Sequence, residues 1–178
     1  KTELSSKNEY IKLIIVILIL LLILGGFLLY VSFPLIGGEE IVLSTTPVDP
    51  FDIIRGEYMT IRYEINTIPL NENAKIGDTI YVILEKDENE TSRYKELSFV
   101  KPNKETFIRG KIISISRENM RVEYGIEQYF FERNAKFEKG IRNVKVKLSE
   151  FGGARIFELL DENKESIKII YKNKAITS

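Results

Sequence analysis

The sequence of 178 residues contains no cysteine, no histidine and no tryptophan. Without cysteine there can be no disulfide, no thiolate nucleophile and no zinc–thiolate site. Without histidine, the commonest general base and the commonest transition-metal ligand are both missing. These absences exclude the reaction chemistries and metal sites that depend on either side chain.

The chain also lacks an excess of charge of either sign, because 26 Lys and Arg residues balance 26 Asp and Glu residues. A protein that binds nucleic acid through the phosphates needs a basic surface, and the composition implies none. Nucleic acid is therefore not expected as a partner. The length is enough for one membrane anchor and one domain of ordinary size.

One long apolar run, Leu13 to Ile36, contains no charged residue. At a rise of about 1.5 Å per residue, this run as a helix exceeds a hydrocarbon core of roughly 30 Å. A cleaved signal peptide is the alternative, but its apolar region is normally about 7–15 residues long, and YVSFPLIGGEE is a poor cleavage site. We predict an uncleaved helix that contacts the lipid bilayer through residues 13–36. Within it, Gly25 and Gly26 either permit close helix approach or are simply tolerated facing lipid.

Charged residues on the two sides of the run predict its orientation. Lys1, Lys7 and Lys12 precede it, whereas Glu39 and Glu40 follow it. Basic residues are enriched on the cytoplasmic side of membrane spans. The expected location is the cell membrane, with a single pass, a cytoplasmic N-terminus and an extracytoplasmic C-terminal domain.

The remainder of the chain is rich in short strand-like segments. Between Tyr58 and Ile65 polar and apolar residues alternate, which places Met59, Ile61 and Tyr63 on one face. Similar segments are IGDTIYVILEKD, SRYKELSFVK, the hairpin formed by ETFIRGKIISIS and NMRVEYGI, then VKVKLS, ARIFELL and SIKIIYK, with turns at DENET and DENKES. This pattern predicts a mainly β domain with a barrel-like or sandwich architecture.

One stretch, EQYFFERNAKFEKGIRN, has helical spacing instead. Glu132 and Lys136 stand at i and i+4, and Gly140 is a suitable C-terminal stop. One short helix is therefore expected in the β domain. The predicted organisation is a cytoplasmic segment over residues 1–12, a transmembrane helix over 13–36, a tether over 37–50 and an extracytoplasmic β-rich domain over 51–178.

The stretch VDPFDIIRGEYMTIRY contains polar residues that core packing does not explain. Asp49, Asp52, Arg55, Glu57 and Tyr58 could form a small site for a hard cation such as Ca²⁺, or for an anion held by the arginine. In the simpler interpretation, which we favour, the aspartates cap a turn and the arginine braces it. A calcium loop needs more oxygen ligands than two aspartates provide, so no metal and no cofactor are expected.

A second dense stretch is EYGIEQYFFE, residues 123–132. Its tyrosines, phenylalanines and glutamates could form an aromatic and acidic binding face, but such aromatics more often pack against a core, and packing is favoured. A site shared by this stretch and the Arg55 region is a hypothesis. The residues concerned here are Tyr124, Gly125, Glu127, Tyr129, Phe130 and Glu132.

The run GEYMTIRY, from Gly56 to Tyr63, resembles the signature of the GDYXXLXY family, with Glu57 in place of Asp and Ile61 in place of Leu. The preceding VDPFDIIRG is similar to that family's lead-in, and GDTIYVILEKD, FIRGKI and EYGIEQYFFER resemble family segments in the same order. The resemblance adds Arg109 and Gly110 to the candidate interaction residues.

The resemblance implies a single N-terminal anchor, an external domain and genetic association with multi-pass membrane proteins, without a mechanism. The expected function is that of a non-catalytic accessory or interaction subunit, with a multi-pass membrane protein as its partner and no catalytic residues. The alternative is an envelope hydrolase of the serine–lysine peptidase type, which needs neither histidine nor cysteine. Its nucleophile signature after the anchor is missing, and VSFPLIGG, which contains Ser32, is a poor substitute.

Overall fold

A computed structural model of the chain describes residues 2–36, 38–46, 58–131 and 135–171, and only the backbone of 2–9, 30–36, 135, 136 and 171. The chain divides into two compact units, Lys1–Gly37 and Gly38–Ser178. We refer to them as the helical unit and the β unit.

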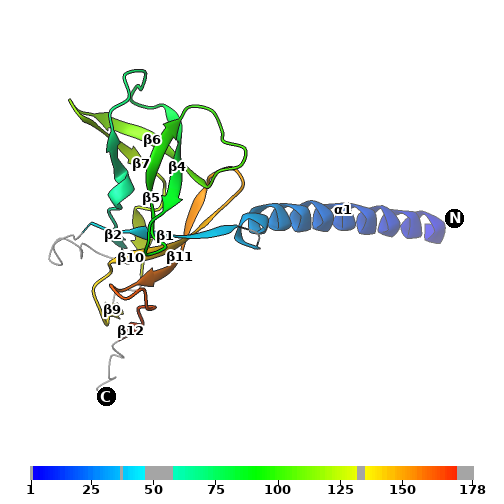
Figure 1. Cartoon of the computed structure of the whole chain (residues 1–178). Coiled ribbons are helices and arrows are strands. Elements are labelled where there is room, and N and C mark those ends of the chain that lie inside the picture. Colours follow the sequence, from blue (N-terminus) through cyan, green and yellow to red (C-terminus); the bar gives the residue numbers. More distant parts are fainter. Residues whose placement is uncertain (1, 37, 47–57, 132–134, 172–178) are drawn as a thin grey trace, which may run out of the picture. The chain divides into compact units, whose positions relative to one another are not determined.

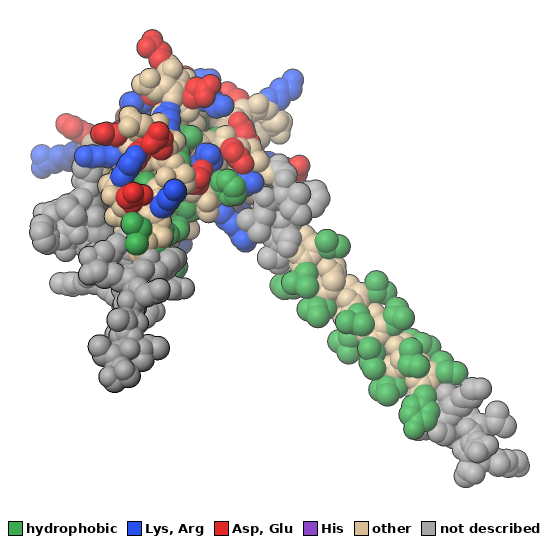
Figure 2. All heavy atoms as spheres, turned by 90° about the horizontal axis from the view of Figure 1, so that it is seen from below, with side chains coloured by type: hydrophobic (Ala, Val, Ile, Leu, Met, Phe, Trp, Pro, Cys, Tyr) green, Lys and Arg blue, Asp and Glu red, His purple; other side chains and the backbone are tan. Residues whose placement is uncertain are grey.

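The helical unit consists of α1 (Thr2–Ile36), which contains the predicted helix over 13–36 and begins before it. Its stretch Tyr10–Leu29 is long and apolar enough to cross a membrane, and no other helix in the described ranges is. Figure 2 shows hydrophobic side chains along the visible face of this helix, whereas the visible face of the β unit carries interspersed acidic and basic side chains. A helix without a polar stripe has no face suited to water.

The β unit is built from twelve strands and one short 3-10 helix within its described residues (Figure 1). Their bounds are β1 (Glu39–Ser44), β2 (Tyr58–Thr60), η1 (Glu64–Asn66), β3 (Thr67–Pro69), β4 (Thr79–Lys86), β5 (Ser92–Ser98), β6 (Phe107–Ile115), β7 (Asn119–Glu123), β8 (Gln128–Phe130), β9 (Ala135–Phe137), β10 (Asn143–Leu148), β11 (Ala154–Leu160) and β12 (Ile169–Tyr171).

The largest sheet has the strand order β3-β7-β6-β4-β5, and a second sheet has the order β1-β10-β11. Strand β1 packs against β5 at one edge of the five-stranded sheet. Beyond β1, Thr45 forms an isolated bridge with Tyr63, close to the other edge at β3. The result is a nearly closed, barrel-like sheet, which confirms the predicted mainly β fold. Two small pairs, β2 with β8 and β9 with β12, complete the described strands.

The core is made by the inward-facing residues, which alternate with outward-facing residues along each strand. In β7, Met120 and Val122 are buried while Asn119, Arg121 and Glu123 are exposed. The predicted alternation from Tyr58 to Ile65 is also confirmed, because every second residue, from Met59 to Ile65, is at most 4% exposed. The strand itself is shorter than the pattern implied, since β2 ends at Thr60 and η1 begins at Glu64.

The tether predicted over residues 37–50 needs correction. Glu39–Ser44 is strand β1, antiparallel to β10, and its Ile41 and Leu43 are 2% and 1% exposed. This segment belongs to the domain because its alternating apolar side chains fill the barrel and its backbone completes a sheet. Residues 47–50 lie outside the described part of the chain.

The short helix predicted in the stretch that ends near Gly140 is wrong. The described residues there form β8, which pairs with β2, and β9, which pairs with β12. An acid–base pair at i and i+4 contributes only a few tenths of a kcal/mol, and a short isolated helix is marginal in water. Pairing with distant strands prevails, and the rings of Phe131 and Phe137 meet edge to face at 5.4 Å.

Candidate functional site

The two stretches highlighted in the sequence meet in the β unit, as far as they are described. In the β2–β8 ladder Tyr58 lies opposite Phe130 and Thr60 opposite Gln128. Just beyond β2, the amide of Ile61 donates to the carbonyl oxygen of Glu127 at 2.7 Å. The other predicted site residues of these stretches, Asp49, Asp52, Arg55, Gly56, Glu57 and Glu132, lie outside the described residues.

Glu127 organises the turn that connects β7 to β8. Its carboxylate oxygen Oε1 accepts from the amide of Tyr124 at 2.7 Å, and Oε2 accepts from the amide of Gly125 at 2.8 Å. Gly125 has a φ of +81°, a conformation that glycine adopts without strain. The predicted acidic residue therefore closes a turn through its own backbone.

Two tyrosines, Tyr63 and Tyr124, connect the two stretches through hydrogen bonds. The Tyr63 hydroxyl donates to the carbonyl of Ile126 at 2.8 Å, and the Tyr124 hydroxyl donates to the carbonyl of Ile65 at 2.7 Å. Burial, and secondarily the Glu127 carboxylate, raises the pKa of both phenols far above the ordinary value. Both stay neutral and act as donors, which makes them structural residues of the core.

Asn66, which the sequence did not single out, joins these groups. Its side-chain oxygen accepts from the amide of Tyr63 at 2.6 Å, which stabilises the 3-10 turn. Its Nδ2 donates to the carbonyl of Val122 at 2.8 Å and to Oε1 of Glu127 at 3.0 Å. The sequence carried no signal for this role, because the alternation places Asn66 on the polar face with Arg62 and Glu64.

Gly110 and Arg109, both in β6, have different roles. A Cβ atom on Gly110 would lie 2.4 Å from Cγ1 of Val122 and 2.8 Å from ring carbons of Tyr124, so any other residue here would force these side chains to move. The Arg109 side chain is exposed, and its amide donates to the carbonyl of Gly152 at 2.8 Å. Neither residue lies in a cluster of chemically reactive groups among those described.

Two aromatic side chains of this region face solvent beside the polar Thr60, Arg62 and Gln128. Tyr58 is 42% exposed and Phe130 is 70% exposed, and their rings lie 6.0 Å apart between centroids. Tyr129, on the opposite face of β8, is partly buried and packs against the core. We call Tyr58 and Phe130 the aromatic pair.

Comparison with protein families decides the affiliation of the chain, because the model of the GDYXXLXY protein family matches residues 20–159. The chain belongs to the GDYXXLXY family. No curated protein and no solved structure matches the chain. The family match includes most of the apolar run of α1 and all strands from β1 to nearly the end of β11.

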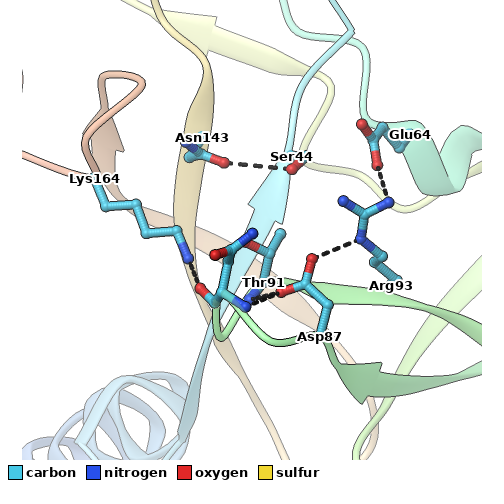
Figure 3. A network of polar contacts seen from close by, with 8 residues as sticks. Ser44, Glu64, Asp87, Thr91, Arg93, Asn143 and Lys164 are labelled. Atoms are coloured by element: carbon cyan, nitrogen blue, oxygen red, sulfur yellow. Dashed lines mark hydrogen bonds and ion pairs between the residues drawn. The ribbon is translucent and has the colours of Figure 1, made fainter.

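Beyond the family signature, this GDYXXLXY protein has a second polar network, built on two similar turns. Figure 3 shows the turn of Asp87 and, from the other turn, Lys164. In one turn the carboxylate of Asp87 accepts from the amides of Asn89 and Thr91, and in the other Asp161 accepts from the amides of Asn163 and Glu165, all at 2.9 Å. Glu90 and Lys164 hold the equivalent positive φ values of 56° and 62°. The signal in the sequence is the repeated DEN at both turns.

Each of these aspartates also forms an ion pair with a basic side chain. Asp87 lies 2.7 Å from Nε of Arg93, and Asp161 pairs with Lys139. The amide of Thr91, followed by Arg93, lowers the pKa of Asp87, while Lys139, followed by backbone amides, lowers that of Asp161. Lys164 joins the two turns, because its ammonium donates to the carbonyl oxygen of Asn89 (Figure 3).

These arrangements are suited to holding strands together. Within the described ranges, no group of three or more acidic side chains is placed to hold a metal ion. Each buried side-chain nitrogen or oxygen in the same ranges has a hydrogen-bond partner. The polar groups described here bind backbone amides and carbonyls, or charged side chains of neighbouring segments.

Proposed function

We propose that this GDYXXLXY protein is a single-pass membrane protein whose β unit, outside the cytoplasm, is a non-catalytic interaction subunit of a membrane complex. Its partner is a multi-pass membrane protein. The interaction surface is the aromatic pair together with the adjoining signature residues that precede Tyr58.

The anchor in this proposal is supported by the composition of α1 and its flanks. Residues 13–29 contain no charged side chain, with Lys7 and Lys12 before them and Glu39 and Glu40 after them. Basic residues on the N-terminal side favour a cytoplasmic N-terminus. A Cβ atom on Gly25 or Gly26 would meet nothing within 4 Å, which leaves bare backbone on the helix for another membrane helix to approach.

The interaction role is supported by a contrast within the signature region between polar groups that are bound inside the fold and large side chains that face solvent. The buried or partly buried polar groups of this region are bound to backbone: the hydroxyls of Tyr63 and Tyr124 and the carboxylate of Glu127 all have such partners. Thr60, Arg62 and Gln128 are exposed, and beside them Tyr58 and Phe130 are exposed side chains that are large and mostly apolar. Exposed aromatic residues are typical anchors of protein interfaces, where they add contact area at little entropic cost.

The test is affinity purification of the tagged full-length protein in a mild detergent, with mass spectrometry of the proteins that accompany it. The variant replaces both Tyr58 and Phe130 by Ala. The matched control is Phe157→Ala, since Phe157 is a 56% exposed aromatic residue on β11. We expect a multi-pass protein to accompany the native chain and the control, with recovery about tenfold or more lower in the double variant.

The same preparation separates the components of the proposal. Equal recovery of all partners by the double variant would contradict the role of the aromatic pair, and Arg55→Ala then examines the preceding part of the signature. An N-terminal sequence that begins after α1 would identify a cleaved signal peptide and contradict the anchor. Turnover of a peptide or glycan substrate by the purified chain, or labelling by an active-site probe, would replace the interaction role with the hydrolase alternative.

A further inference from the structure

Two neighbouring loops of the β unit present large apolar side chains to solvent. The loop between β5 and β6 carries Phe99 and Val100, which are 42% and 76% exposed, and the turn between β10 and β11 carries Phe151, which is 65% exposed. The ammonium of Lys101 lies 4.7 Å from the centre of the Phe151 ring, so the two loops touch. We call residues 99–106 and 149–153 the entry loops.

The entry loops lie at the point where the chain enters the β unit. Glu39, the first residue of β1, accepts a hydrogen bond from the Thr106 hydroxyl at 2.8 Å. In the β1–β10 ladder, Glu39 is opposite Leu148, the residue directly before the second loop. Figure 1 shows the loop after β5, the turn between β10 and β11 and the start of β1 on one side of the β unit.

Covalent connection limits how far this side can be from the end of α1. The helix ends at Ile36 and β1 begins at Glu39, three residues later. Three residues of fully extended chain span at most about 10 Å. If α1 is inserted in a bilayer, the connection therefore limits how far Glu39, which Thr106 of the first entry loop contacts, can be from the surface from which the helix emerges.

The exposure of Phe151 is built into a rigid turn. The amide of Ser149 donates to the carbonyl of Gly153 at 2.8 Å, and the amide of Gly152 donates back to the carbonyl of Ser149 at 2.9 Å. The carbonyl of Gly152 accepts from Arg109 of β6, and a Cβ atom on Gly152 would lie 2.7 Å from the ring of Phe107. The turn is thus fastened to the barrel with its aromatic side chain directed outward.

We propose that the entry loops are a lipid-binding surface, which inserts Phe99, Val100 and Phe151 into the headgroup and upper acyl region of the bilayer that holds α1. The proposal rests on the proposed membrane anchor. Aromatic and aliphatic side chains partition into this interfacial region, and lysine stems extend along it while the ammonium reaches lipid phosphates. Lys101 and Lys104 of the first loop are both exposed and can serve in this way.

Chain continuity favours lipid over a protein as the occupant. A docked protein needs affinity from its own contacts, whereas the anchor holds these loops at the bilayer at high effective concentration, so a small apolar area is sufficient. Contact at this side would also orient the β unit. The aromatic pair lies toward the other end of β1, where Thr45 bridges Tyr63, about 20 Å away along the strand, and would remain available to a protein partner.

The absence of tryptophan from the chain provides the experiment, because each engineered tryptophan is then the only one present. The full-length protein is reconstituted in vesicles of phosphatidylethanolamine and phosphatidylglycerol in three forms: without brominated lipid, with lipid brominated near the headgroup, and with lipid brominated near the ends of the acyl chains. Phe151→Trp and Val100→Trp report on the entry loops, Phe130→Trp reports on the distant aromatic pair, and Leu20→Trp reports on α1.

The expected result is blue-shifted emission with at least twofold quenching by brominated lipid at positions 151 and 100, and solvent-like, unquenched emission at position 130. Quenching at position 20 without quenching at 151 and 100 overturns the lipid-binding surface while the anchor survives. Absence of quenching at position 20 contradicts the anchor itself, and with it this inference. Quenching at 130 equal to that at 151 also overturns it, because no particular face would then bind lipid.

Discussion

The ring of Tyr124 covers the bare backbone of Gly110, with its Cδ1 and Cε1 atoms only 2.8 Å from the position a Cβ atom would occupy. The ring can pack here because Gly110 has no side chain. The Tyr124 hydroxyl donates to the carbonyl of Ile65, which connects the end of β7 to η1. A glycine on β6 thus leaves room for the tyrosine that follows β7.

This relationship predicts that Gly110→Ala destabilises the β unit by about 1–3 kcal/mol, the usual range for overpacking a core. Urea unfolding followed by circular dichroism measures it. Gly140→Ala is the matched control, because a Cβ atom there meets nothing within 4 Å. Equal midpoints for the two variants would show that Tyr124 can move aside without loss.

Glu127→Gln is expected to lower the free energy of unfolding by about 1–3 kcal/mol. The amide keeps one acceptor oxygen but presents an NH₂ group where the carboxylate accepts from the amides of Tyr124 and Gly125. Glu123→Gln, on an exposed position of β7, is the control. An unchanged unfolding midpoint for Glu127→Gln would mean that the turn closes without the carboxylate.

Leu43→Ala distinguishes a strand from a tether at the start of the β unit. Leu43 is 1% exposed within the core, and truncation of a buried leucine typically costs 2–5 kcal/mol. Val42→Ala, on the outward face of β1, should have a much smaller effect. If both substitutions left the unfolding free energy of the β unit unchanged, residues 39–44 would be a tether after all.

The lowered pKa of Asp161 predicts that the β unit loses stability in acid. Lys139, followed by the amides of Glu165 and Asn163, lowers the pKa of Asp161 in the folded protein. A carboxyl group with a lowered folded pKa stabilises the fold above its unfolded pKa of about 3.9, and this contribution disappears as pH falls below that value. The stabilisation is therefore complete at neutral pH.

Asp161→Asn keeps an acceptor for the turn but removes the charge paired with Lys139. The difference in unfolding free energy between the native chain and this variant should be largest near pH 7 and should shrink from about pH 4 downward. Urea titrations at a series of pH values give this difference, with Glu162→Gln as the exposed neighbouring control. A difference that is constant from pH 7 to pH 3 would contradict the ion-pair explanation.

The sequence predicted the strands that carry a clear alternation, and much less of how they pair. Segments such as the β6–β7 hairpin were found because the period of two is local, and a short turn leaves little choice of partner. Strand β1 was missed because its partner β10 is distant in sequence. Strands β8 and β9 have three residues each, and they exist only through pairing with β2 and β12.

The candidate residues show the same division. The alternation of polar and apolar residues predicted that Ile61 and Tyr63 face the core, and both are buried. Two other features depend on segments about 60 residues apart in the sequence. The Tyr63 hydroxyl donates to the carbonyl of Ile126, and Asn66 connects Tyr63 with Glu127. Hydrogen-bond partners of this kind have no periodic signal, so neither the role of Asn66 nor the need for glycine at 110 could be read from the chain.

The sequence by itself determined the apolar, charge-free run over residues 13–36, the mainly β class, the polar turns and the absence of cysteine and histidine chemistry. Each of these depends on composition or on spacing within a few residues. Only the tertiary structure decided that residues 39–44 are a strand, that the two signature stretches meet, and that the aromatic pair and the entry loops occupy different ends of β1. These features depend on contacts between distant segments, whose free energies arise only when the barrel assembles.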